Sequence, residues 1–127
     1  MNTEPTDIDL SLLRQRVERE IETYHYDFPD TAIGNPFTDA AIQSGLVQFR
    51  ASLIEPYWTE VEIRDTREQV DMIAGPRRKC VAIADDGRGM LLLFDPAERS
   101  FVLAERRSTG LATFGVRGDA VGCFLAR

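Results

Sequence analysis

The fold is decided by residues 80–116, which read CVAIADDGRGMLLLFDPAERSFVLAERRSTGLATFGV. Stretches that begin with or consist of apolar residues, at 80–84, 90–94, 101–107 and 111–116, alternate with stretches rich in Asp, Gly, Pro and Ser. These residues are typical of turns, because Gly reaches positive φ, Pro presets φ and Asp bonds to nearby backbone amides. Short apolar runs between turn residues predict β-strands. The stretch therefore predicts an antiparallel meander.

A further strand is predicted ahead of the meander, at residues 57–64. Its side chains alternate between a more apolar set and a more polar set, as expected of a strand with one buried face. The first set is Tyr57, Thr59, Val61 and Ile63, and the second is Trp58, Glu60, Glu62 and Arg64. Residues 65–74 fit either a short helical turn or a strand, and GPRRK at 75–79 predicts a turn or loop.

The N-terminal part has the period of an amphipathic helix instead. Residues 9–25 predict a first helix, and its apolar face carries Leu10, Leu13, Val17, Ile21 and Tyr24. A second helix is expected to begin at Thr38 or Asp39 and to be stopped by Pro56, with an apolar face of Ile42, Leu46, Phe49 and Leu53. Gly45 is expected to pack against the first helix, since a glycine otherwise weakens a helix interior.

Helices followed by strands predict an α+β fold. We expect one domain over residues 1–127, in which the two N-terminal amphipathic helices pack on an antiparallel sheet of four to six strands. Residues 1–8 are expected to form a flexible tail. Residues 118–127 fit a short closing helix at 120–126 or further β structure.

Composition and charge exclude several classes of protein. No stretch approaches the roughly 20 apolar residues of a membrane helix, and the polar N-terminus has no features of a secretory signal. We therefore expect a cytoplasmic protein that does not enter membranes. The net charge is −6, which disfavours nucleic acid as a partner. Fourteen of the fifteen basic residues are Arg, with Lys79 the exception, and we interpret this as the codon bias of a GC-rich bacterial genome.

Neither catalytic nor metal-binding patterns emerge from the sequence. His25 is the one histidine, and Asp27 near it does not complete a known catalytic motif. Asp85, Asp86 and Asp95 are interpreted as turn residues, because Asp bonds to nearby backbone amides. We expect no enzyme activity, no cofactor and no metal.

Cys80 and Cys123 lie among apolar neighbours and are expected to be reduced core residues. The basic runs at 77–79 and 106–107 are interpreted as solvated loops, because they lack the interleaved aromatic residues typical of nucleic-acid sites.

Trp58 is the residue that the sequence singles out for binding. By strand alternation it lies with Glu60, Glu62 and Arg64, on the face away from Val61 and Ile63. An exposed Trp beside charged residues is typical of a binding hot spot. The alternative is that a helix covers this face and Trp58 is a core residue. The four residues Trp58, Glu60, Glu62 and Arg64 are therefore the predicted partner-binding site.

Two segments carry a resemblance to a known family. VAIADDGRGMLLLFD at 81–95 resembles the strand–turn–strand segment of the SUKH superfamily, and GDAVGCFLA at 118–126 is similar to its closing helix. The resemblance covers residues 80–127. It implies a bacterial immunity protein that binds and neutralises a toxin, without catalytic residues.

These observations favour a non-enzymatic protein-binding module. Residues 1–75 carry 15 acidic and 6 basic side chains, a net charge of −9, so a basic protein such as a toxin is the expected partner. A self-associating structural or regulatory subunit is the alternative, followed by a small enzyme with an unrecognised site. The sequence leaves the oligomeric state open.

Overall fold

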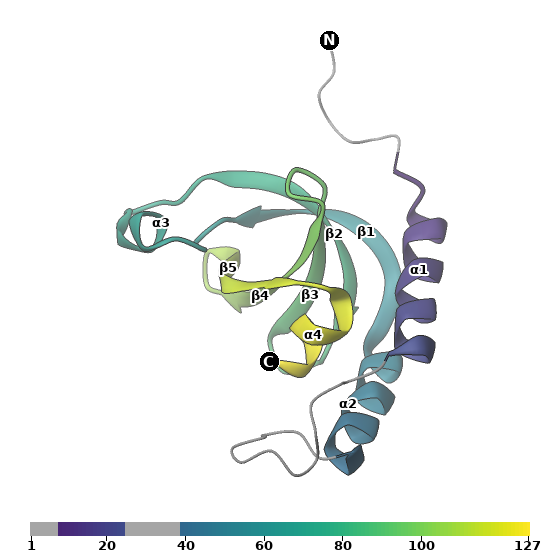
Figure 1. Cartoon of the computed structure of the whole chain (residues 1–127). Helices are drawn as coiled ribbons and strands as arrows, with labels where there is room; N and C mark the ends of the chain where they lie inside the picture. Colours follow the sequence, from purple (N-terminus) through teal and green to yellow (C-terminus); the bar gives the residue numbers. More distant parts are fainter. Residues whose placement is uncertain (1–7, 25–38) are drawn as a thin grey trace.

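The computed structural model describes residues 8–24 and 39–127, which form a five-stranded barrel with helices against its outer surface (Figure 1). The strands are β1 Leu53–Glu62, β2 Arg77–Asp85, β3 Met90–Asp95, β4 Ser100–Arg107 and β5 Gly110–Gly118. The helices are α1 Leu10–Thr23, α2 Asp39–Ser52, α3 Arg67–Asp71 and α4 Ala120–Leu125. The predicted α+β class, the two N-terminal helices and the short closing helix are confirmed.

Each strand pairs antiparallel with the next one along the chain, so the predicted meander is confirmed. The sheet also closes on itself, because β1 and β5 pair in parallel at Val61 with Leu111 and at Glu62 with Ala112. This closure joins residues that lie far apart in the sequence. Local periodicity therefore does not predict it.

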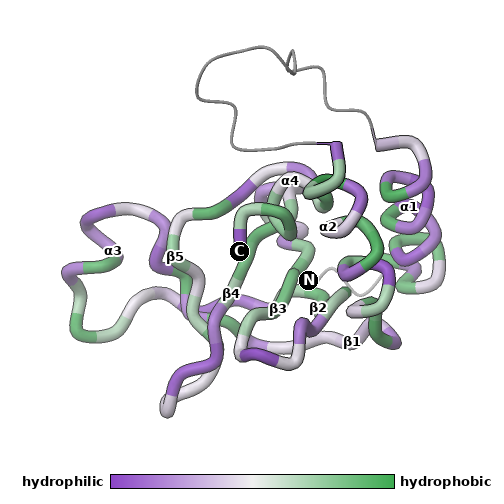
Figure 2. Tube along the Cα trace, turned by 90° about the horizontal axis from the view of Figure 1, so that it is seen from below, coloured by the Kyte–Doolittle hydropathy of each residue, from purple (hydrophilic) through white to green (hydrophobic). Residues whose placement is uncertain are grey.

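The barrel wall separates two apolar clusters. Alternate residues of β2 show the division: Cys80 and Ala82 lie in the inner cluster, and Val81 and Ile83 lie in the outer cluster. The outer cluster is completed by buried side chains of α1, α2 and α4. Strands β2, β3 and β4 are therefore covered on both faces, which explains their continuous apolar runs (Figure 2).

The helices are placed by caps and by close packing. The carboxylate of Asp9 caps α1 by accepting the amide hydrogens of Ser11 and Leu12, at 2.9 and 3.2 Å. In α2, the ring of Phe49 stacks on that of Phe124 in α4, with centroids 4.4 Å apart. None of the helices in the described ranges has the length and apolarity to cross a membrane.

The structure corrects the expectation for Gly45. A side chain at this position would collide with Leu125, so the glycine admits α4 and not α1. The reason is that α4 packs on α2 as well as on strands β3, β4 and β5. It is a later part of the chain, which the helical periodicity of α2 cannot reveal.

Two boundaries also differ from prediction. Leu53 begins β1 instead of continuing the second helix, and Pro56 lies inside this strand. The register shifts between Leu53 and Tyr57, and such an irregularity accommodates a proline that cannot donate to the ladder. Residues 77–79 belong to β2 and not to a loop, because they pair with residues 60–62 of β1.

Candidate protein-binding surface

A loop leaves the barrel between β1 and β2 and carries α3. We call residues 64–75 the α3 projection. It extends from the barrel on the side away from α1 in both views (Figures 1 and 2). Its two ends are held together where the amide of Ile63 donates to the carbonyl of Pro76 at 2.7 Å. The projection is thus a loop whose two ends are fixed to each other at the barrel.

A capping box forms α3 within the projection. The amide of Gln69 donates to the hydroxyl of Thr66 at 3.2 Å, and the side-chain oxygen of Gln69 accepts the amide hydrogens of Thr66 and Asp65, at 3.0 and 2.9 Å. Such reciprocal bonds satisfy amides that the first helical turn leaves without partners. This is why a helix of five residues forms here.

The side chain of Arg64 lies inside the projection and organises it. Its guanidinium donates to the carbonyl of Gln69 at 3.2 Å, to that of Val70 at 2.9 Å and to that of Ile73 at 3.1 Å. Its Nε donates to the carboxylate of Glu62. Arginine suits this position because its planar fork presents several donors in a fixed geometry.

Glu62 anchors Arg64 to the barrel. The hydrogen bond from Arg64 lowers the pKa of Glu62 below its ordinary value, against burial, and the charges of Arg64 and Arg77 lower it further. The carboxylate is therefore ionised when it holds the guanidinium. Strand β1 and the tip of the projection are joined by this chain of charged hydrogen bonds.

Asp65 ties the base of the projection to β5. Its carboxylate accepts the amide hydrogen of Gly115 at 3.2 Å and the Nε hydrogen of Arg117 at 3.2 Å. Burial alone would raise the pKa of Asp65, but hydrogen bonds from Arg117 and Thr113 and the charge of Arg117 outweigh it and lower the pKa.

Arg117 continues this network into the barrel end. It donates to the fully buried carboxylate of Asp95 at 2.9 Å, and Arg78 also pairs with Asp95 at 3.2 Å. Burial would lower the pKa of Arg117, and the bonds to Asp65 and Asp95 raise it overall. The projection therefore rests on a base of paired charges.

The projection exposes a group of apolar side chains among its charged ones. Ile73 is fully exposed, and Val70 and Met72 expose 55% and 49% of their surface. Isolated exposed apolar side chains are common, but a group of them on one ordered loop is typical of an interaction site. A loop that is already held in place loses less conformational entropy when it binds.

The structure does not bring the four predicted site residues together as one open surface. Trp58 is half-buried and packs against the outer apolar cluster, as in the alternative that a helix covers this face. The physical reason is that helices cover the outer face of the barrel, so a side chain that points away from Val61 and Ile63 still enters a core. Alternation gives the direction of a side chain but not what covers it.

The other three residues lie at and beside the base of the projection. Glu62 is buried and Arg64 is half-buried, and both are engaged with each other. Glu60 is exposed and pairs with Arg77 at 3.2 Å. The sequence thus selected residues that support the projection and missed the apolar residues that it exposes. Val70, Met72 and Ile73 could have drawn attention in the sequence, because they are apolar residues in a polar stretch that shows neither helical nor strand periodicity.

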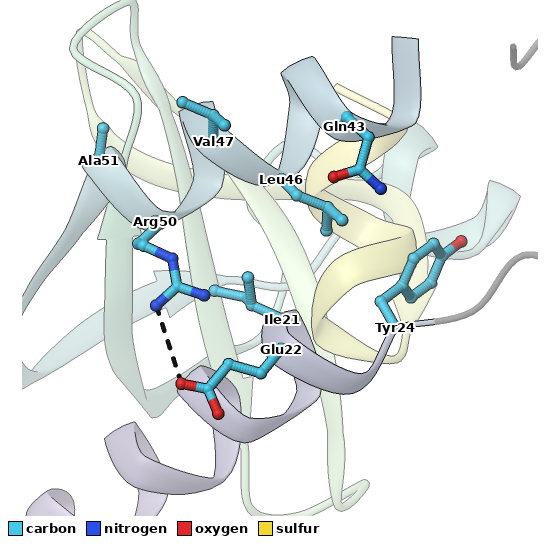
Figure 3. Close-up of a pocket in the computed structure, with 8 residues that line it drawn as sticks. All are labelled: Ile21, Glu22, Tyr24, Gln43, Leu46, Val47, Arg50 and Ala51. Atoms are coloured by element: carbon cyan, nitrogen blue, oxygen red, sulfur yellow. Dashed lines mark ion pairs between the residues drawn. The ribbon is translucent and has the colours of Figure 1, made fainter. Parts of the chain in front are cut away.

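A groove between α1 and α2 is the second surface feature (Figure 3). It has a volume of about 620 Å³ and combines apolar side chains such as Leu46 and Val47 with an ion pair between Glu22 and Arg50, at 4.0 Å. The paired charges leave its rim electrically balanced. His25 and Asp27 lie outside the described residues.

The predicted turn aspartates are confirmed in that role. Asp85 accepts the amide hydrogen of Gly87 at 2.8 Å, Asp86 that of Arg88 at 2.7 Å and Asp95 that of Ala97 at 3.1 Å. Within residues 8–24 and 39–127, no group of three or more His, Cys, Asp or Glu side chains could hold a metal ion.

Both cysteines are buried and unpaired, as predicted. Burial raises the pKa of Cys80 and of Cys123 to about 12, and nearby carboxylates add to the effect. These thiols are therefore protonated at neutral pH and pack as small apolar groups.

Comparison with known proteins finds no family model, no curated protein and no solved structure that matches the chain. The resemblance to the SUKH superfamily stays a prediction.

Proposed function

We propose that this chain is a non-enzymatic protein-binding module and that the α3 projection is the part that inserts into its partner. The observation that carries this proposal is the fully exposed Ile73, flanked by Met72, on a loop whose backbone is bonded to the guanidinium of Arg64. An apolar side chain held rigidly in water gains free energy when a partner covers it, at about 25 cal/mol per Å². A receptor for it would offer an apolar pocket.

The charges of the module favour a basic partner. The chain has a net charge of −6, and the projection itself carries the exposed acidic residues Glu68 and Asp71 beside Arg67. Complementary charge raises the rate of association, and salt screens the effect. More specifically, we propose an immunity-type bacterial protein that neutralises a basic toxin in the cytoplasm. The negative charge and the resemblance described above support that form.

The test is affinity capture from the native host, with the wild-type chain compared with Ile73→Asp. The substitution places a charge where a partner pocket must be apolar, and it leaves the fold intact because the side chain touches solvent. We expect the captured partner to be basic and its dissociation constant, measured by calorimetry, to rise at least about 30-fold, which corresponds to the roughly 2 kcal/mol of a binding hot spot.

Val47→Asp is the matched control, because Val47 is also a well-exposed apolar residue but lies on α2, in the groove of Figure 3. It should retain the partner with wild-type affinity. A partner that binds Ile73→Asp as tightly as the wild-type chain would show that the projection is not the binding site.

A further inference from the structure

The chain also carries a concave surface that is complementary to its own projection. This α1 groove lies between the start of α1 and the turn that joins β3 to β4, and it has a volume of about 590 Å³. Its apolar lining includes Ile8, Leu12, Phe94 and Pro96, and Leu12 is 61% exposed. Arg16 and Arg99 line the same groove.

The charge of the α1 groove is positive, in contrast to that of the whole chain. Neither Arg16 nor Arg99 lies within 4.0 Å of a carboxylate of the described residues, and the guanidinium of Arg16 lies over the ring of Phe101, at 5.8 Å. The one acidic residue of the lining, Asp9, is engaged in capping α1. The charge of Arg16 also acts on the carboxylate of Glu20 on the same helix. The groove thus pairs an apolar floor with two arginines.

The α3 projection has the opposite properties. It is convex and exposes Val70, Met72 and Ile73. Its exposed charged residues are Glu68, Asp71 and Arg67, and because Arg67 pairs with Asp71 at 4.0 Å they leave one net negative charge. An apolar and acidic loop complements an apolar and basic groove in both shape and charge. Contact between two projections would join two convex tips of the same net charge, which bury little area.

We propose that a second copy of this chain inserts its α3 projection into the α1 groove. This inference rests on the proposed function, since it uses the same projection. The projection and α1 lie on opposite sides of the barrel, so each copy offers its tip to one neighbour and its groove to another. Such a head-to-tail contact builds a ring or an open chain and not a two-fold dimer. A foreign partner would compete with it for the tip.

Sedimentation velocity of the full chain over a wide range of concentration tests this inference. The wild-type chain should form oligomers larger than a dimer, less readily as salt rises. Ile73→Asp places a charge on the apolar tip of the projection, and Leu12→Asp places a charge in the apolar lining of the groove. Each variant alone should therefore be monomeric. Leu12 is exposed in the first turn of α1, where a carboxylate is compatible with the helix dipole.

The decisive sample is an equal mixture of the two variants. One copy keeps an intact groove and the other an intact tip, so the mixture should form a one-to-one dimer and nothing larger. Val47→Asp should associate like the wild-type chain. Far-UV circular dichroism shows whether each variant is folded.

Three results would overturn the inference: a wild-type chain that stays monomeric at every concentration, a Leu12→Asp variant that still associates, or a mixture without the dimer. The proposed function is judged separately. A foreign partner that Leu12→Asp retains and Ile73→Asp loses would support the binding role of the projection, even where the chain does not associate with itself.

Discussion

In the barrel, apolar side chains such as Leu93 and Leu103 are buried, and charged side chains such as Arg107 at the end of β4 face water. In the α3 projection the order is reversed, because the guanidinium of Arg64 is enclosed and the apolar side chain of Ile73 lies in solvent. Both regions are ordered, but different forces hold them. The barrel is stabilised by burial of apolar surface, and the projection by hydrogen bonds, several of which come from the single cation Arg64.

Because the apolar side chains are buried in the barrel but exposed on the projection, the barrel determines stability and the projection is available for binding. Apolar surface that the barrel uses for its own core is unavailable to a partner, whereas the projection keeps its apolar side chains free because polar bonds form its shape. Substitutions in the two regions should therefore have opposite consequences for folding and for association.

The largest expected effect is on the barrel side of the comparison. Phe49→Ala removes a fully buried ring that stacks on Phe124, and we expect the free energy of unfolding to fall by about 3–5 kcal/mol. Ile73→Ala, a truncation of a fully exposed side chain, should change it by less than about 0.5 kcal/mol. Chemical denaturation followed by Trp58 fluorescence measures both. A large loss of stability in Ile73→Ala would show that the projection has a core role.

A smaller effect is expected from the enclosed cation. Arg64→Ala removes the donors to the carbonyls of Gln69, Val70 and Ile73, and we expect a loss of about 2 kcal/mol, typical of hydrogen bonds to a charged group. The amides of residues 66–75 should exchange with deuterium faster, while those of β3 and β4 should not. Arg67→Ala is the control, since its exposed pair with Asp71 at 4.0 Å is worth little. Unchanged exchange in Arg64→Ala would mean that other contacts hold the loop.

The smallest expected effect is a dependence on pH at the base of the projection. Because the pKa of Asp65 is lower in the folded state than in the unfolded chain, its ionised form stabilises the fold above about pH 4, and this contribution is lost as pH falls through the folded pKa. Asp65→Asn should lower the stability by about 1–2 kcal/mol at neutral pH, and the difference from the wild-type chain should shrink in acid. Urea denaturation at several pH values measures it. A difference independent of pH would assign the effect to packing.

Local pattern was sufficient for most elements of this fold, although it left the segment of α3 open between helix and strand. Turn residues such as those around Gly87 separate the strands, and helical spacing identifies α1 with its buried Leu13, Val17 and Ile21. Closure of the barrel could not be predicted from local pattern, because it depends on the pairing of Val61 with Leu111, which lie 50 residues apart in the sequence. The start of β1 was misplaced because Leu53 continues a helical spacing and Pro56 usually marks an element boundary.

The candidate site was only partly predictable. Alternation placed Glu62 and Arg64 on the side away from Ile63, and they do lie at the base of the projection. It could not show that Arg64 turns inward, since the hydrogen bonds that hold it come from the folded loop. Trp58 pointed away from the barrel interior as expected, but coverage by the helices follows from the tertiary structure alone.

Helix α4 has a consequence for the order in which the chain folds. It contacts α1 and α2, which are synthesised much earlier. The amide of Val121 donates to the carboxylate of Glu20, 101 residues earlier, at 2.7 Å. Leu125 fills the space beside Gly45 of α2. Until α4 has left the ribosome, both helices expose the faces that it will cover. The packing of α1 and α2 is therefore complete only once this late segment has been synthesised.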